Sequence, residues 1–214
     1  MSLKLNSQLA RAADEIAAGI RESGKYVGII TRAEKLTART GTVGLGLSFK
    51  ADSGQTADYL DLYHTKGDGE TLSGLKTVNA ILCCTKVSEA TEGPIQCEKW
   101  QDGGRQRVTV TGYPALMGKR VGLLLQQVLE TGKDGKDGKD REKVQIFAVF
   151  NADTELTASE MYDKKTKPER LPNMLDALLA RPVRENRKGG KVKPAGRSAA
   201  DDYSSMPPDD DIPF

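Results

Sequence analysis

Apolar and polar residues alternate along the first part of the chain in the way that is typical of β-strands. Residues 44–50 carry Leu, Leu and Phe at every second position, residues 57–64 alternate in the same manner, and residues 25–36 are rich in Val and Ile. Successive side chains of a strand point to opposite faces, so each segment would bury one face and expose the other. Turn-forming residues separate the three segments, and an antiparallel meander is therefore expected.

The spacing of apolar residues changes to a helical period in other parts of the chain. Residues 7–22 form a short amphipathic pattern that ends before Gly24, and residues 71–86 gather their apolar positions near one face. Residues 157–165 and 172–180 follow the same rule over shorter lengths. Side chains three and four positions apart share one face of a helix, so these segments are predicted to be helical.

A hairpin and two further strands are expected after the helix at 71–86. Residues 94–100 and 105–113 flank a glycine-containing turn, while residues 119–130 and 143–151 are apolar and are separated by a polar, repetitive loop. Three strands, a helix and two strands is the element order of an OB-fold. The predicted fold is mainly β with helices: an OB-fold-like five-stranded barrel, an N-terminal helix, a helix between strands 3 and 4, and a disordered C-terminal tail.

The composition indicates that part of the chain is solvated and does not belong to a packed core. Hydrophobic residues make up 37% of the 214 residues, and the mean hydropathy is -0.50. The net charge of +2 hides a segregation, because residues 184–197 are basic and residues 201–211 are acidic. A stretch of this kind buries too little apolar surface to fold, so a flexible linker that changes from basic to acidic is predicted for residues 182–208.

Neither a membrane nor an oxidising compartment is indicated by the sequence. No apolar run approaches the roughly 20 residues of a membrane helix, and the first residues lack the basic and apolar regions of an export signal. The three cysteines, Cys83, Cys84 and Cys97, have no metal-ligand spacing and are odd in number. A cytoplasmic location without membrane contact is therefore expected.

The residues give little support for catalysis. His64 is the only histidine, and residues 41–46 lack the Lys-Ser/Thr pair of a phosphate-binding loop. Asp58 and Asp61 would fall on opposite sides of a strand, which disfavours a two-metal centre. The sequence predicts a protein that is not an enzyme and that holds no metal and no cofactor.

The last six residues form an acidic docking tip, 209–214. Such a peptide cannot fold alone, but its aromatic end can fill an apolar pocket while its carboxylates meet Arg or Lys of a partner. The tip resembles the acidic C-terminal tip of bacterial single-stranded DNA-binding proteins. The resemblance implies recruitment of replication, recombination or repair proteins through Asp209, Asp210, Asp211, Ile212, Pro213 and Phe214.

A second resemblance concerns the core. Residues 116–126 (LMGKRVGLLLQ) and 150–160 (FNADTELTASE) are similar to phage-encoded OB-fold single-stranded DNA-binding proteins. This implies that residues 24–156 form a DNA-binding core, between the N-terminal helix of 1–23 and a helical extension of 157–181. The protein would coat single-stranded DNA without strong sequence preference, in phage DNA replication, recombination or repair, inside the bacterial host. Homo-oligomerisation stays open.

Flat side chains for the bases and cations for the phosphates are what single-strand binding requires. If Leu60 and Leu62 are buried, Tyr59 and Tyr63 lie on the solvent side of their strand as a stacking platform, and Trp100 beside its turn would clamp a base. The candidate phosphate contacts are Arg32, Lys35, Arg39, Lys50, Arg105, Arg107 and Lys119. There are competing interpretations: the tyrosines could cover another element, Trp100 could anchor the hairpin, and the cations could simply be solvated.

Other functions are also compatible with the same residues. A recombination mediator or annealing protein would bind single strands but would form rings or filaments on them. An adaptor would carry the docking tip without binding DNA. A carboxylate-dependent nuclease is a more remote third option.

Overall fold

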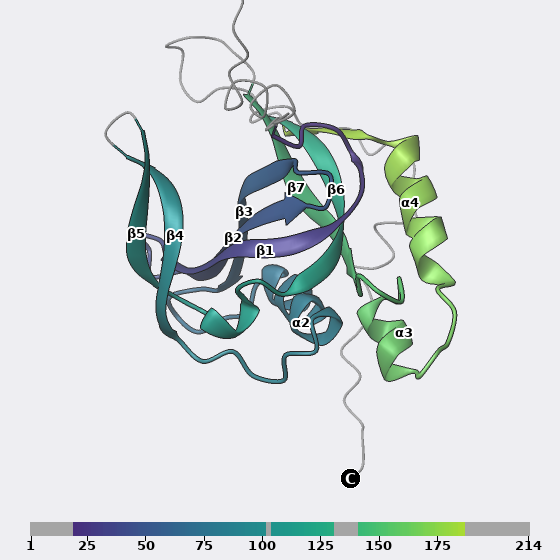
Figure 1. Cartoon of the computed structure of the whole chain (residues 1–214), viewed down its shortest axis with the longest axis horizontal. Coiled ribbons are helices and arrows are strands. Elements are labelled where there is room, and N and C mark those ends of the chain that lie inside the picture. The colour runs from purple at the N-terminus through teal and green to yellow at the C-terminus, as the bar shows by residue number, and fades with distance from the viewer. Residues whose placement is uncertain (1–18, 102–103, 131–140, 187–214) are drawn as a thin grey trace, which may run out of the picture.

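The computed structural model describes residues 19–101, 104–130 and 141–186 (Figure 1). In this part the fold is mainly β, as predicted, and its strands join in one sheet. The strands are β1 (Gly24–Thr37), β2 (Val43–Ala51), β3 (Thr56–Thr65), β4 (Gly93–Gln101), β5 (Gly104–Gly112), β6 (Arg120–Glu130), β7 (Arg141–Phe150) and β8 (Val183–Asn186). The helices are α2 (Gly74–Cys84), α3 (Ala158–Tyr162), α4 (Arg170–Ala180) and the 3-10 turn η1 (Pro114–Leu116).

β1 is the strand around which the sheet is organised. It pairs antiparallel with β2, which pairs antiparallel with β3, and this is the expected meander. On its other edge the first half of β1 pairs with β6, and Glu34 pairs with Gly112 of the β4–β5 hairpin. β6 continues to β7. No hydrogen-bonded pairing joins β3 to β7 within the described strands, so the sheet is not closed.

The main hydrophobic core lies between the inner face of the sheet and α2. Alternate residues of the strands, such as Leu47 and Leu60, are buried in one cluster with Ile81 of α2. Burial of these positions follows directly from the alternation in the sequence, because every second side chain of β2 and β3 points inward.

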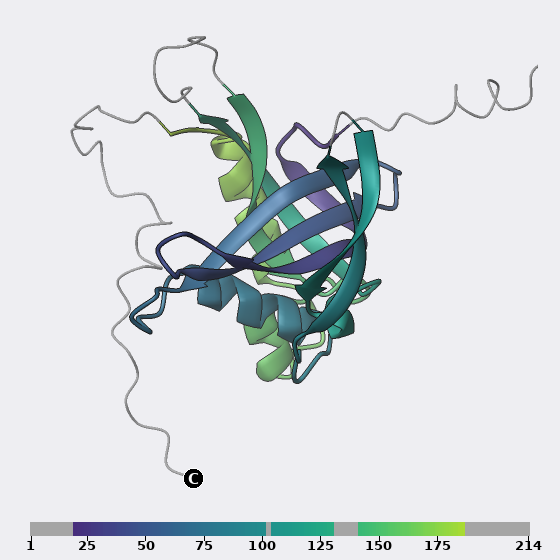
Figure 2. The ribbon, with the colours of Figure 1, turned by 90° about the vertical axis from the view of Figure 1, so that its left-hand side faces the viewer.

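A second, smaller cluster covers the outer side of β6 and β7. Leu124 and Phe150 of these strands are buried beneath Leu171 and Leu178 of α4. Figure 2 looks onto β1, β2 and β3, with α2 below them and α4 behind. Among the described residues, no helix covers the outer side of β2 and β3, while α4 covers that of β6 and β7. Among the helices of the described residues, none combines the length and apolar character that crossing a bilayer requires.

The helices after residue 70 are confirmed, but the end of the N-terminal helix is not. Residues 1–18 lie outside the described part, and residues 19–23 are not helical. The backbone N–H of Ile20 donates to the Thr56 carbonyl at 2.7 Å, and the Ile20 side chain is buried. The prediction of helix for 19–23 was wrong because the edge of β3 offers these residues a pairing partner and an apolar site.

Part of the segment that was predicted to be a flexible linker forms a strand. Val183–Asn186 forms β8, which pairs parallel with Gln127–Glu130 of β6. The pairing of β1 with β6 ends where Gly24 of β1 meets Leu125 of β6. The edge of β6 beyond Leu125 is therefore available to β8. The remainder of the linker, the tip at 209–214 and the loop at 132–140 lie outside the described residues.

Candidate nucleic-acid interface

The side of β1, β2 and β3 that faces away from the core gathers several of the predicted residues. We call it the outer face. Its members follow from strand register, since paired residues of adjacent strands share a side. Register assigns to it Arg32, Glu34 and Leu36 of β1, Gly44, Gly46, Ser48 and Lys50 of β2, and Asp61 and Tyr63 of β3. Tyr59 lies in a register shift of β3 and joins them because Arg32 lies over its ring.

Tyr59 sits in a β-bulge of β3. Leu47 pairs with Leu60 and Phe49 with Ala57, so β3 carries one residue more than β2 over this interval. Tyr59 has φ of 59°, in the left-handed region that a bulky residue rarely adopts. Its side chain is 63% exposed. A bulge re-aims side chains, and here it presents the tyrosine ring to solvent.

The inner side of the Tyr59 ring rests near a buried cation. The guanidinium carbon of Arg32 lies 5.2 Å from the ring centroid, and Arg32 is only 5% exposed. A cation over an aromatic face is attracted by about 0.5–2 kcal/mol. The sequence predicted Arg32 as a phosphate contact, whereas the structure places it beneath the ring, where it supports Tyr59.

Arg32 belongs to a network of charges along β1 and β4. Its Nη1 donates to a Glu34 oxygen at 3.3 Å and its Nη2 to the Leu47 carbonyl at 3.4 Å, while Nε has no partner in the described part of the chain. Lys99 of the hairpin donates to the other Glu34 oxygen at 2.6 Å. Two cations therefore neutralise Glu34, and the long contacts of Arg32 leave its guanidinium available to the aromatic ring.

The Tyr63 side chain lies close to Gly44 of the neighbouring strand. Tyr63 pairs with Gly44, and a Cβ at that glycine would be 3.0 Å from Cδ1 of the ring. The Tyr63 side chain is 41% exposed. A glycine at this position leaves room for the aromatic side chain beside the β2 backbone.

Replacing Gly44 with valine should therefore displace Tyr63 and destabilise the fold by about 1–3 kcal/mol, as overpacking does. The new Cβ would also meet the Leu62 carbonyl oxygen at 3.0 Å, so the strand itself must shift. Urea denaturation measures the loss. Gly104→Val is the matched control, because a Cβ at Gly104 meets no described atom within 4 Å. Equal stability of the two variants would contradict this placement of the ring.

The predicted cations are only partly brought together. Lys50 is exposed on the outer face and has no salt bridge with any described residue. Lys35 shares the side of Leu45, on the other side of β1, and donates to Glu92 at 2.7 Å. The hydrogen bond with Glu92 raises the pKa of Lys35. Lys35 therefore does not join the outer face.

The other predicted contacts lie elsewhere. Arg39, Arg107 and Lys119 are exposed, in the β1–β2 connection, on β5 and just before β6. Trp100 and Arg105 pair with each other through their backbones in the β4–β5 hairpin, which stands beside the meander (Figure 1). Their side chains lie outside what the structure describes.

Sequence reasoning missed Glu34, Lys99 and Asp61 as members of the site. Asp61 lies between the two tyrosines on β3, and burial raises the pKa of its carboxyl, with Arg32 opposing the rise and Glu34 adding to it. The alternation of residues 59, 61 and 63 was a sufficient signal for Asp61. Lys99 contacts Glu34 although the two residues are 65 positions apart in sequence. No local pattern in the sequence predicts such a contact.

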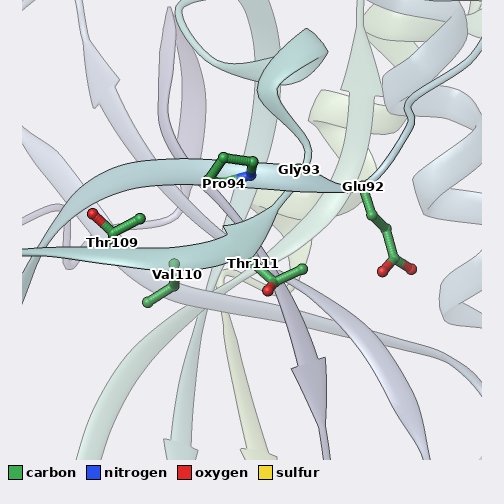
Figure 3. Close-up of a pocket in the computed structure, with 6 residues that line it drawn as sticks. All are labelled: Glu92, Gly93, Pro94, Thr109, Val110 and Thr111. Atoms are coloured by element: carbon green, nitrogen blue, oxygen red, sulfur yellow. The ribbon is translucent and has the colours of Figure 1, made fainter.

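A shallow hollow on the hairpin is distinct from the outer face. It has a volume of about 340 Å³ and is lined by Glu92, Gly93, Pro94, Thr109, Val110 and Thr111 (Figure 3). Glu92 is the charged residue in this lining, and its carboxylate would repel phosphate. The hollow therefore does not extend the candidate interface. Within the described ranges, no three His, Cys, Asp or Glu side chains gather as a metal site.

Comparison with other proteins identifies no family for this chain. No protein-family model matches the chain, and no curated protein matches it.

Proposed function

We propose that the protein binds single-stranded DNA along the outer face, without being an enzyme. The observation that carries this proposal is the pair of exposed tyrosines on β3, one backed by Arg32 and the other close to Gly44. Stacking of a base on an aromatic ring contributes about 1–3 kcal/mol per base. Two rings on one strand therefore suffice for useful affinity.

The strand order supports an OB-fold as the scaffold. β1, β2, β3, β6 and β7 would be the five barrel strands, with α2 between the third and the fourth and the β4–β5 hairpin inserted after the helix. β3 and β7 also contact each other, although no hydrogen-bonded ladder links them. OB-folds bind oligonucleotides on the face of strands 2 and 3, and the outer face contains the corresponding strands of this chain.

The charges of the outer face favour base stacking over phosphate binding. Arg32 and Lys99 are paired with Glu34, Asp61 adds a negative charge, and Lys50 adds a positive one. A face with nearly balanced charge releases few counterions, so the affinity would fall only gently with salt.

An oligothymidylate of about 15 nucleotides should therefore bind at least about tenfold more tightly than a duplex of the same length, because paired bases offer no free ring faces. Fluorescence anisotropy with labelled strands at low and physiological salt measures both affinities. Equal binding of the duplex would contradict the proposal. Absence of binding to either would favour an adaptor, and rings or filaments on long strands would favour an annealing protein or recombination mediator.

The proposal includes the docking tip. We propose that the tip at 209–214 binds replication, recombination or repair proteins that have a basic, apolar pocket. This binding would take place in the cytoplasm of a phage-infected bacterium. The supporting observation is the sequence resemblance of Asp209 to Phe214. A competition experiment between the full chain and the chain lacking these six residues, for a host protein that binds such tips, tests this part separately.

A further inference from the structure

Asp61 is the one carboxylate of the outer face that has no cation bonded to it within the described residues. It pairs with Gly46 through the backbone, and the space above Gly46 is occupied by the methyl groups of Leu36. Leu36 offers no hydrogen bond. Glu34, by contrast, is held by both Arg32 and Lys99. The charged groups near Asp61 are Arg32 and Glu34 of β1 and Lys143 of β7.

Its position decides which part of a bound strand can face it. Tyr59 and Tyr63 flank Asp61 on the same side of β3, so bases stacked on these rings would turn their edges toward the carboxylate. A phosphate in the same place would be repelled by the unpaired negative charge. Because a carboxylate only accepts hydrogen bonds, it favours a base edge that donates them.

We propose that Asp61 is a specificity-determining residue, which makes the outer face prefer bases with an exocyclic amino group, such as cytosine, over thymine. This inference rests on the proposed function. The amino group of cytosine donates to a carboxylate, as in direct readout of duplex DNA. Thymine presents its N–H between two carbonyl oxygens, which the carboxylate repels. The preference modulates a general affinity and does not define a recognition sequence.

Oligocytidylate and oligothymidylate of about 15 nucleotides, titrated by anisotropy at slightly alkaline pH, test the proposal. Both are pyrimidines with similar ring area, so stacking contributes similarly to each. We expect wild-type protein to bind the cytosine strand about five- to tenfold more tightly, the lower part of the range known for base discrimination. Asp61→Asn should reduce this ratio to near one, since the amide both accepts and donates, and should leave thymine binding equal or tighter.

Asp176→Asn is the matched control, because it removes the same charge from an exposed position on α4, away from the outer face. It should keep the wild-type ratio, and thermal melting should show both variants folded. If the wild-type ratio is near one, or if Asp61→Asn retains the preference, the inference is overturned while single-strand binding stands. If wild-type protein binds neither strand, the proposed function fails and this inference fails with it.

Discussion

Tyr59→Ala should weaken the binding of oligothymidylate by about tenfold or more, because one stacked base contributes about 1–3 kcal/mol. Tyr59 is 63% exposed and has Arg32 behind its ring, so its truncation removes a contact surface and little of the core. Tyr59→Phe should bind nearly as wild type, since stacking needs the ring and not the hydroxyl. Anisotropy titration with the same labelled strand measures all three proteins.

Tyr162→Ala is the control for this series. Tyr162 belongs to α3 and is 77% exposed, so it matches Tyr59 in residue type and exposure but does not lie on the outer face. Its replacement should leave the affinity within about twofold, a free-energy change well below that of one stacked base. A loss as large as that of Tyr59→Ala would argue that DNA binding does not depend on the outer face.

The backbone of Tyr59 offers a second, independent check. Its left-handed φ costs about 1 kcal/mol for a residue with a side chain, and glycine adopts this conformation freely. Tyr59→Gly should therefore lose DNA affinity as Tyr59→Ala does. The relieved backbone strain should offset much of the lost Arg32–Tyr59 attraction, so the free energy of unfolding in urea should fall by less than about 1 kcal/mol. A loss of affinity accompanied by unfolding would instead indicate that Tyr59 acts through the fold.

The alternation of residues was enough to predict the meander and the exposed side of β3. Burial of Leu60 fixes the direction of its neighbours along the strand, and the structure indeed exposes Tyr59 and Tyr63. The same rule also separates Lys35 from Arg32, because residues three positions apart on a strand lie on opposite sides. The sequence analysis listed both cations as phosphate contacts, and the structure places them on opposite sides of β1.

Two features of the site were beyond any local rule. The bulges between Ile30 and Arg32 and between Leu47 and Phe49 shift the registers, and they decide that Arg32 lies beneath Tyr59. The Lys99–Glu34 contact depends on how the β4–β5 hairpin packs beside β1. Such contacts are set by tertiary packing between distant segments, about which the period of apolar residues contains no information.

A different prediction concerns Glu160, whose carboxylate joins α3 and α4. Glu160 is 1% exposed and accepts four hydrogen bonds: from the backbone N–H and hydroxyl of Thr157, both at 2.8 Å, and from the backbone N–H groups of Glu169 and Arg170, at 2.7 and 2.8 Å. It thereby caps α3 and holds the start of α4. Glu160→Gln keeps the shape but has one acceptor oxygen in place of two, and two donors remain buried without partners.

We expect Glu160→Gln to lower the free energy of unfolding by about 2–4 kcal/mol, since each unsatisfied buried donor costs about 1–3 kcal/mol. Urea denaturation at neutral pH measures the loss. Glu169→Gln is the control, because Glu169 is exposed and its side chain makes a surface salt bridge with Lys165. Such a pair contributes about 0–1 kcal/mol, so this variant should stay within that range of wild type.

The stability difference between wild type and Glu160→Gln should also depend on pH. Burial alone would raise the pKa of Glu160, but the hydrogen bonds from Thr157, Arg170 and Glu169 lower it from 4.5 to about 2. A carboxylate with a lowered pKa stabilises the folded state above its unfolded pKa, and this contribution is lost as the pH falls through the folded pKa. The advantage of wild type over Glu160→Gln should therefore be full at neutral pH and should shrink between about pH 4.5 and pH 2. A difference that stays constant over this range would show that Glu160 is not ionised in the folded protein.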